Sequence, residues 1–303
     1  MVELRLDRAL SIGLAKPFLH LTNAQRQPRI PILMYHGIRS GVDTKHPYFE
    51  TNTSPQAFAS QMEFLHRRGY SAVTLSDAVE AIAAGGDGQK RVALTFDDGY
   101  LDFYDRALPV LARLGLAATA FIVSGFARKE PSSLNDRKYM DWNQVRDARR
   151  HGIEIGSHTV THLELYTASA NEVDEQVGRS KQTIEDELGE PIRSFSYPFA
   201  FPELSKEFTS SLRASLQAHG YQNGVTTVIG TATRKHDRFF LPRLPVNSHD
   251  DLRLFQAKLQ GGYDWLHFPQ QIYKRLKCNA PWIRGLADAE TPQNKPVRSL
   301  LLL

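Results

Sequence analysis

Strand-like runs recur along this chain, and plausible helices lie between them. The runs that read as strands lie near residues 31–36, 70–74, 91–96, 117–123, 153–156, 193–197 and 224–229. Strands that alternate with helices form a largely parallel sheet, because each parallel pair needs a crossover connection. With about seven such units in one domain, we expect an α/β barrel rather than an open sheet.

Three helices can be bounded from their terminal residues. Ser54 is a predicted N-cap, and Pro55 suits the first position of the helix that follows. A second helix is expected over 170–188 and a third over 204–219. Each of these two is followed at once by a glycine, which is typical of a helix C-terminus.

The composition fits a globular chain with a sizeable core. The chain has 303 residues, of which 41% are hydrophobic and 23% charged. Its net charge of +4 is spread over scattered Lys and Arg residues, so we expect solvated helix faces and no nucleic-acid partner. A single cysteine, Cys278, excludes an internal disulfide framework and argues against thiolate ligation of a metal.

We expect an N-terminal extension over residues 1–30, a barrel domain over 31–275 and a tail over 276–303. Leucines recur among basic residues in the extension, which predicts an amphipathic helix that docks on the domain. Peripheral contact of this helix with a membrane is the alternative. No run reaches the roughly 18 apolar residues of a transmembrane helix, and no secretory signal is recognisable, so a cytoplasmic protein is expected.

Two acids and two histidines follow predicted strands. Asp97 and Asp98 end one strand and precede a glycine that makes a turn easy, although a plain surface turn has the same pattern. His158 and His162 have a spacing that places two imidazoles on one face of a helix or tight loop; two polar loop histidines are the alternative. Functional groups of a barrel gather at the carboxyl ends of its strands. One acid with both histidines therefore indicates an open metal site, and the other acid is left as a base.

Residues 95–100 (TFDDGY) and 157–162 (SHTVTH) together resemble the first two motifs of the polysaccharide deacetylases, the NodB-homology carbohydrate esterases. The resemblance extends over about residues 31–250 and implies a distorted (β/α)7 barrel with a divalent metal. That metal is usually Zn²⁺, with Co²⁺ or Ni²⁺ as alternatives. The resemblance also implies that Asp98, His158 and His162 are the metal ligands and that Asp97 is the general base.

A third segment, residues 194–200 (SFSYPFA), stands where this family has its third motif, but it departs from the usual pattern. By resemblance, the backbone N–H of Phe199 is the candidate donor to a tetrahedral oxyanion. Ser196 replaces an arginine that normally orients the base. Arg243 could take that role from another strand; an ion pair with a purely structural role is the alternative.

Two histidines are candidates for the general acid. His36 ends the first predicted strand, in residues 33–36 (LMYH). Some biofilm-polysaccharide deacetylases resemble a circular permutation that moves the family's Leu-x-His motif to such a place. His249 looks more like part of a helix N-terminus, so we expect His36 to be the acid. Candidate substrate-binding aromatic residues are Trp142, Tyr197 and Tyr100.

We therefore expect a metal-dependent enzyme that removes acetyl groups, above all N-acetyl groups, from an acetylated carbohydrate. The substrate would be a polysaccharide, an oligosaccharide or a lipid-linked precursor in exopolysaccharide or cell-envelope metabolism. One alternative is an amidase that cleaves another N-acyl group, such as formyl. The other is a metal-free glycan-binding protein, which the missing third-motif arginine favours. The spare acid argues against the second alternative, because a binding module needs no general base.

Overall fold

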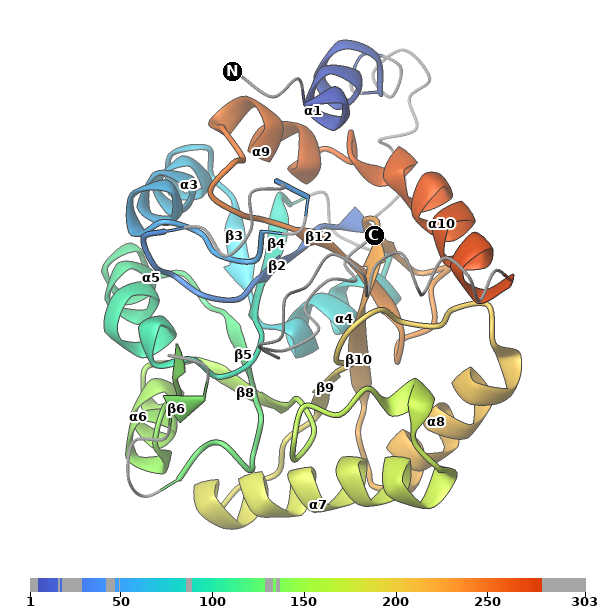
Figure 1. The fold of residues 1–303 in the computed structure, drawn as a ribbon. Coiled ribbons are helices and arrows are strands. Elements are labelled where there is room, and N and C mark those ends of the chain that lie inside the picture. Colours follow the sequence, from blue (N-terminus) through green and yellow to red (C-terminus); the bar gives the residue numbers. More distant parts are fainter. Residues whose placement is uncertain are drawn as a thin grey trace.

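The computed structural model describes residues 5–15, 17, 29–41, 47–48, 50–85, 89–128, 133–134 and 137–279. Its main sheet is parallel, and all its strands except β3 (Ser71–Val73) close into a ring (Figure 1). The ring closes because β2 pairs with β12 on one side and with β4 on the other. In order around the ring the strands are β2 (Ile32–Tyr35), β4 (Arg91–Phe96), β5 (Thr119–Ile122), β8 (Glu154–Ser157), β9 (Ser194–Ser196), β10 (Asn223–Ile229) and β12 (Leu241–Pro245). The predicted (β/α)7 barrel is confirmed.

The other helices surround this ring, whereas α4 (Leu75–Ala83) lies across one end of it (Figure 1). The surrounding helices are α3 (Pro55–Arg67), α5 (Leu108–Leu114), α6 (Trp142–Arg150), α7 (Ala170–Leu188), α8 (Lys206–Ala218), α9 (Leu252–Leu259) and α10 (His267–Asn279). One hydrophobic cluster lies between the strands and the outer helices. A second, smaller cluster joins inward-facing strand residues such as Ala93 and Val225 to α4. The short pairs β1 (Arg29–Ile30) with β11 (Ala232–Thr233), and β6 (Ser133–Leu134) with β7 (Arg137–Lys138), lie outside the ring.

The predicted helix boundaries agree closely with the structure. The Ser54 hydroxyl accepts the N–H of Ala57 at 3.2 Å, so it caps α3 as expected. Helix α7 covers the whole range 170–188 and ends at Gly189, whose φ of 71° favours glycine. Helix α8 is slightly shorter than predicted.

One predicted strand has a different place in the sheet. The run 70–74 forms β3, which pairs only with the beginning of β4 and is not part of the ring. The remaining place in the ring belongs to β12, which is not among the predicted runs. Its sequence Leu-Pro-Arg-Leu-Pro contains two prolines, and proline cannot donate to a strand ladder, so the pattern argues against a strand.

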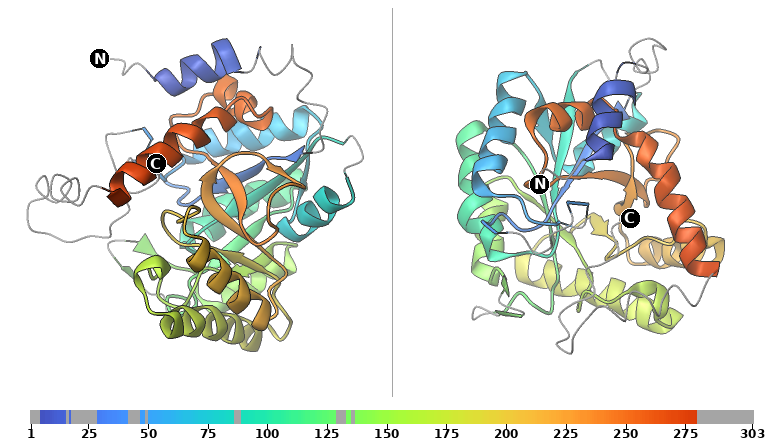
Figure 2. Two further views of the ribbon diagram at one scale, coloured as in Figure 1. Left: turned by 90° about the vertical axis from the view of Figure 1, so that its right-hand side faces the viewer. Right: turned by 45° about the horizontal axis from the view of Figure 1, so that its top comes forward.

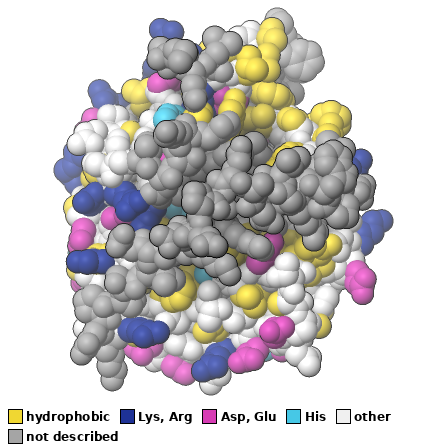
Figure 3. Space-filling view, viewed as in Figure 1, with side chains coloured by type: hydrophobic (Ala, Val, Ile, Leu, Met, Phe, Trp, Pro, Cys, Tyr) yellow, Lys and Arg dark blue, Asp and Glu magenta, His cyan; other side chains and the backbone are white. Residues whose placement is uncertain are grey.

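The N-terminal segment docks on the barrel, as expected. It consists of α1 (Leu6–Leu10) and a π-helical turn, Ser11–Ala15, and it lies beside α9 (Figure 2). Asp7 is buried and accepts the hydroxyl of Tyr263 at 2.9 Å, while Ser11 accepts the indole N–H of Trp265 at 3.0 Å. Hydrophobic side chains over α1 remain exposed near the top of Figure 3.

The expected boundary between domain and tail falls inside α10, and the tail from residue 280 onward lies outside the described residues. Among the helices that the structure describes, none has the length and apolar character of a transmembrane span.

Candidate active site

The alternation of side chains along the strands decides which residues enter the barrel. Successive residues of a strand point to opposite faces. On β4, Ala93 belongs to the inner cluster, whereas Val92 and Leu94 belong to the outer one. The same alternation carries Thr95 and then Asp97 to the inside of the ring. His36, Ser196 and Arg243 occupy equivalent inward positions on or just beyond β2, β9 and β12.

The three predicted metal ligands converge at the carboxyl ends of β4 and β8. Asp98 Oδ1 lies 3.4 Å from His158 Nε2 and 3.3 Å from His162 Nε2. One ligand atom from each residue lies within 4.8 Å of the other two. In the part of the chain that the structure describes, this is the one cluster of at least three His, Cys, Asp or Glu side chains with such spacing.

This geometry fits a small divalent cation. Two ligands at about 2.0–2.1 Å from zinc in a tetrahedral arrangement are about 3.3 Å apart, which matches the two separations from Asp98. Asp98 Oδ1 is buried, and it has no hydrogen-bond partner among the described residues. His158 Nδ1 lies 2.8 Å from the carbonyl oxygen of Ser196, an acceptor that fixes the tautomer with Nε2 free to bind a metal.

The other acid, Asp97, is held by a buried arginine. Arg243 donates from Nη1 to Asp97 Oδ1 at 2.8 Å and from Nη2 to Oδ2 at 2.7 Å. The guanidinium is fully buried, and every one of its N–H groups has an acceptor. The other acceptors are Thr95 Oγ1 at 3.1 Å, the Thr226 carbonyl at 2.9 Å and Ser196 Oγ at 3.1 Å. Arg243 thus orients Asp97 bidentately, from a different strand than the usual third-motif arginine.

Ser196 also takes part in holding Asp97. Its hydroxyl accepts from Arg243 and donates to Asp97 Oδ1 at 3.2 Å. In the sequence, this position is notable only for the absence of the usual arginine. The contribution of the serine and of Thr95 becomes visible only when β4, β9 and β12 are brought together.

The charges of these groups shift one another's pKa values. Burial alone would raise the pKa of Asp97, but Arg243 and the neighbouring imidazoles hold it below its usual value. Burial likewise opposes the charge of Asp98, yet His158 and His162 hold the pKa of Asp98 well below its usual value. Both acids are therefore carboxylates at neutral pH.

Strained backbone is concentrated at this site. The non-glycine residues with positive φ in the described chain are Asp98 (74°), Thr159 (68°), His162 (56°) and Phe199 (59°). Such conformations cost about 1–3 kcal/mol each and persist where surrounding structure imposes them. Two of these residues are predicted ligands, Thr159 follows the third, and the ring of Phe199 packs on the imidazole of His162 with centroids 4.5 Å apart.

The loop that contains Phe199 is fixed from β10. Thr227 donates its hydroxyl to the Phe199 carbonyl at 2.8 Å and accepts the N–H of Phe201 at 3.0 Å. Within the described residues, the N–H of Phe199 has no acceptor, so it is available to a bound oxyanion.

Of the two candidate acids, His36 lies at the site and His249 does not. His36 Nε2 is 3.9 Å from Asp97 Oδ2. Burial lowers the pKa of His36, although the charges of Asp98 and Asp97 act in the opposite direction. His249 is exposed, and its carbonyl oxygen accepts from Arg5 of the N-terminal segment at 2.8 Å.

The structure does not support two of the three aromatic residues predicted to bind substrate. Trp142 is 5% exposed and Tyr197 is 1% exposed, and both pack in the outer core. Neither offers a ring face to a sugar, so these two predictions are wrong in this structure. Tyr100 is partly exposed, and burial together with the nearby charge of Asp98 raises its pKa. It remains a candidate contact.

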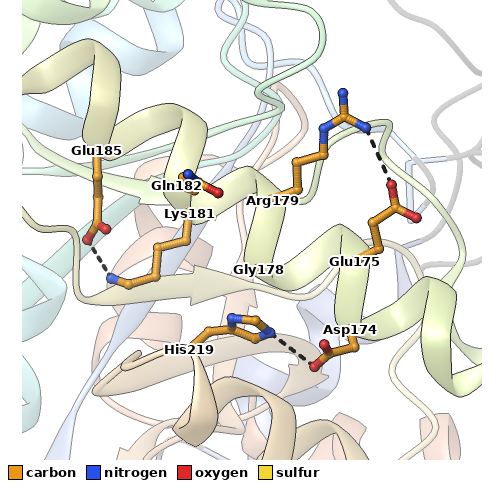
Figure 4. A pocket seen from close by; sticks show the side chains of 8 residues that line it. All are labelled: Asp174, Glu175, Gly178, Arg179, Lys181, Gln182, Glu185 and His219. Carbon is orange, nitrogen blue, oxygen red and sulfur yellow. Dashed lines mark hydrogen bonds and ion pairs between the residues drawn. The ribbon is translucent and has the colours of Figure 1, made fainter.

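A hollow of about 540 Å³ on the outer wall, between α7 and α8, contains none of the predicted site residues (Figure 4). Its ion pairs join Lys181 to Glu185, Arg179 to Glu175 and His219 to Asp174. Each of its charged side chains thus has a partner within the hollow, which leaves no single charged group directed at a ligand. The residues that line it are Asp174, Glu175, Gly178, Arg179, Lys181, Gln182, Glu185 and His219.

Known proteins with similar sequences identify the family of this chain. Residues 84–224 match the family model for polysaccharide deacetylases. The protein YxkH of Bacillus subtilis (strain 168), which is named as a polysaccharide deacetylase, is 31% identical over 224 residues, 74% of this chain and 73% of that protein. The chain belongs to the polysaccharide deacetylase family.

More distant relatives share part of the sequence or the fold. Poly-β-1,6-N-acetyl-D-glucosamine N-deacetylase of Escherichia coli (strain K12) is 35% identical over 113 residues, which are 34% of this chain and 17% of that protein. The Streptococcus pyogenes deacetylase PplD in complex with acetate has a TM-score of 0.67 at 22% identity, with 77% of this chain and 99% of that chain covered. IcaB from Ammonifex degensii has a TM-score of 0.64 at 22% identity, with 78% and 99% covered. These two structures share the barrel fold.

Proposed function

We propose that this deacetylase is metal-dependent and hydrolyses N-acetyl groups of a poly- or oligosaccharide or its lipid-linked precursor. Asp98, His158 and His162 would hold the cation, with Zn²⁺ the simplest choice for such ligands. The observation that carries the proposal is a ligand set beside a second carboxylate, Asp97, which is held separately by Arg243. A divalent cation bound there would polarise the acetyl carbonyl and make a water molecule more acidic.

The remaining groups suit an amide hydrolysis. Asp97, a carboxylate at neutral pH, accepts the proton of the water molecule that attacks the acetyl carbon. The N–H of Phe199 donates to the oxyanion that forms on the carbonyl oxygen. His36 donates a proton to the nitrogen as the carbon–nitrogen bond breaks, so the products are acetate and a free amine.

The names of the relatives support an N-acetylglucosamine substrate. Besides the Escherichia coli protein, poly-β-1,6-N-acetyl-D-glucosamine N-deacetylase of Staphylococcus epidermidis is 21% identical over 65% of this chain. We infer that the substrate is an N-acetylated amino-sugar chain of an exopolysaccharide or the cell envelope.

Acetate release and metal content together test the proposal. The purified protein is treated with a chelator, reloaded with Zn²⁺, Co²⁺ or Ni²⁺, and incubated with β-1,6- and β-1,4-linked N-acetylglucosamine oligomers and with acetylated xylan. We expect activity only after metal is restored. A protein that binds none of these ions and releases no acetate would contradict the proposal and favour a glycan-binding role, and release of formate from N-formyl sugars alone would favour the other amidase.

Point variants separate the roles of the two acids. Asp98→Asn and His158→Ala should lose metal and activity together, because each removes a ligand. Asp97→Asn should keep its metal and lose turnover. His36→Ala should be impaired, whereas His249→Ala, at an exposed histidine beside Arg5, is the matched control and should behave like the wild type.

A further inference from the structure

The segment between β5 and α6 returns to the active site through a short hairpin. In this hairpin β6 pairs antiparallel with β7, so that Leu134 is opposite Arg137. Just beyond the hairpin, Tyr139 forms an antiparallel bridge with Tyr100, and the N–H of Met140 donates to the carbonyl of Gly99 at 3.0 Å. The hairpin is therefore attached directly to the loop that follows the two catalytic-site acids.

Arg137 extends from this hairpin across two active-site loops. Its Nη2 donates to Asn52 Oδ1 at 2.6 Å, and its Nη1 lies 3.9 Å from Asp102 Oδ2. Its guanidinium carbon is 4.4 Å from the centroid of the Tyr100 ring, a cation–π contact. The side chain is only 11% exposed, so contacts with the protein rather than with solvent fix its position.

The same guanidinium lies against the backbone next to His36. A Cβ atom on Gly37 would come within 2.3 Å of Arg137 Nη1 and 2.5 Å of Asn52 Oδ1, so no larger residue fits there without moving one of them. The next N–H, of Ile38, donates to Asp102 Oδ1 at 3.0 Å. Arg137 and its partner Asp102, which lies in the segment after β4, thus hold the loop that follows β2 in place.

We propose that Arg137 is a positioning residue, which sets the loop that carries His36 against the loop that carries Asp97 and Asp98. The separation between the two catalytic groups, 3.9 Å from His36 Nε2 to Asp97 Oδ2, depends on how these two loops meet. Displacement of a catalytic group by about 1 Å can lower turnover about a hundred-fold. The kinetic consequence rests on the proposed deacetylation; the structural role does not.

The kinetic test uses three variants. Arg137→Met keeps the apolar stem and removes the guanidinium, Arg137→Lys keeps the charge without the planar fork, and Lys138→Met removes an exposed charge from the next residue as a control. For Arg137→Met we expect kcat for acetate release to fall about ten- to a hundred-fold, with KM and bound zinc nearly unchanged. Arg137→Lys should recover only a small part of this loss, and Lys138→Met should match the wild type.

A second measurement needs no substrate. Backbone amide exchange should be faster in peptides that cover residues 36–40 and 99–104 of Arg137→Met, and also of Gly37→Ala, which disturbs the same contact from the other side. The strand β8 should exchange as in the wild type in all variants. Wild-type exchange and kcat in Arg137→Met would overturn the proposal, as would faster exchange throughout the barrel. If the wild type releases no acetate, the proposed function fails, and the exchange pattern still decides the role of Arg137.

Discussion

Replacement of Arg243 by methionine should show how strongly the Asp97 carboxylate depends on this one side chain. Met keeps an apolar stem of similar length but leaves the Asp97 carboxylate without its bidentate partner, in a place where its side chain is only 2% exposed. Removal of one member of a buried ion pair typically costs about 3–5 kcal/mol of folding stability. The loss of folding stability has an upper bound, because Asp97 can take up a proton instead of remaining an unpaired buried charge. Protonation of a carboxyl with an ordinary pKa of about 3.8 requires about 4.4 kcal/mol at pH 7, so the unpaired charge cannot cost more than this.

Because this upper bound depends on pH, the loss of stability in Arg243→Met should depend on pH as well. In the wild type, the lowered pKa of Asp97 contributes stability that is present above the unfolded-state pKa and is lost as the pH falls through the folded-state pKa. In Arg243→Met, the pKa of Asp97 should rise, so this variant should lose stability as the pH increases. The difference between the two proteins should therefore widen by up to about 1.4 kcal/mol per pH unit between pH 5 and 7.

Urea unfolding at pH 5, 6 and 7, in a chelator so that bound metal does not contribute, measures this difference. The double variant Asp97→Asn/Arg243→Met has no charge to leave unpaired, so it should be more stable than Arg243→Met at pH 7 and should lack the pH-dependent gap. Two results would refute the reasoning that the arginine acts through the charge of Asp97. One is that the stability losses of Asp97→Asn and Arg243→Met add up to the loss of the double variant; the other is that the stability difference between wild type and Arg243→Met does not change with pH.

Three further results are expected. Ser196→Arg/Arg243→Ser, which returns the arginine to the position usual in the family, should release acetate at least about ten-fold faster than Arg243→Ser alone, because both positions already contact Asp97. Asp7→Asn should lower the thermal unfolding temperature at pH 7, with a loss of about 3–5 kcal/mol, since Asp7 is buried against Arg5. The pKa of Asp7 is lowered in the folded state, so the effect should persist down to the ordinary carboxyl pKa of about 3.8 and fade only as the pH falls below it. Its control, Arg8→Met, breaks an exposed ion pair and should cost less than about 1 kcal/mol in the same measurement.

The sequence predicted those parts of the protein that are encoded locally. The caps of α3 and α7 depend on residues within one turn of the helix end, and both were placed correctly. The predicted ligand set also comes from two short motifs, since Asp98 lies in the loop that follows β4 and both histidines lie in the loop that follows β8. Strand β12 was missed for a related reason: the two prolines are a local signal against a strand, and only its parallel neighbours β2 and β10 show that it completes the ring.

Whether a side chain is buried was harder to predict than which residues are candidates for the site. Trp142 follows a polar stretch, a place where an exposed ring is plausible. In the structure it is the first residue of α6, after the capping residue Asp141, and the helix turns its ring into the core. A single aromatic residue carries no period, so its sequence neighbours could not distinguish a core position from a sugar-binding one.

The departure at Ser196 can be explained by the geometry of the barrel. Inward-facing side chains from all strands approach one axis, so a long side chain can reach a given carboxylate from more than one strand. Arg243 starts on β12, with β10 between it and β9, and still places Nη2 within 3.1 Å of Ser196 Oγ and 2.7 Å of Asp97. The missing third-motif arginine was the reason to consider a metal-free binding protein. Because the same carboxylate has an arginine from another strand, that reason no longer holds. In such a barrel, loss of an inward-facing motif residue is weak evidence for loss of activity, since a side chain from another strand can take its place.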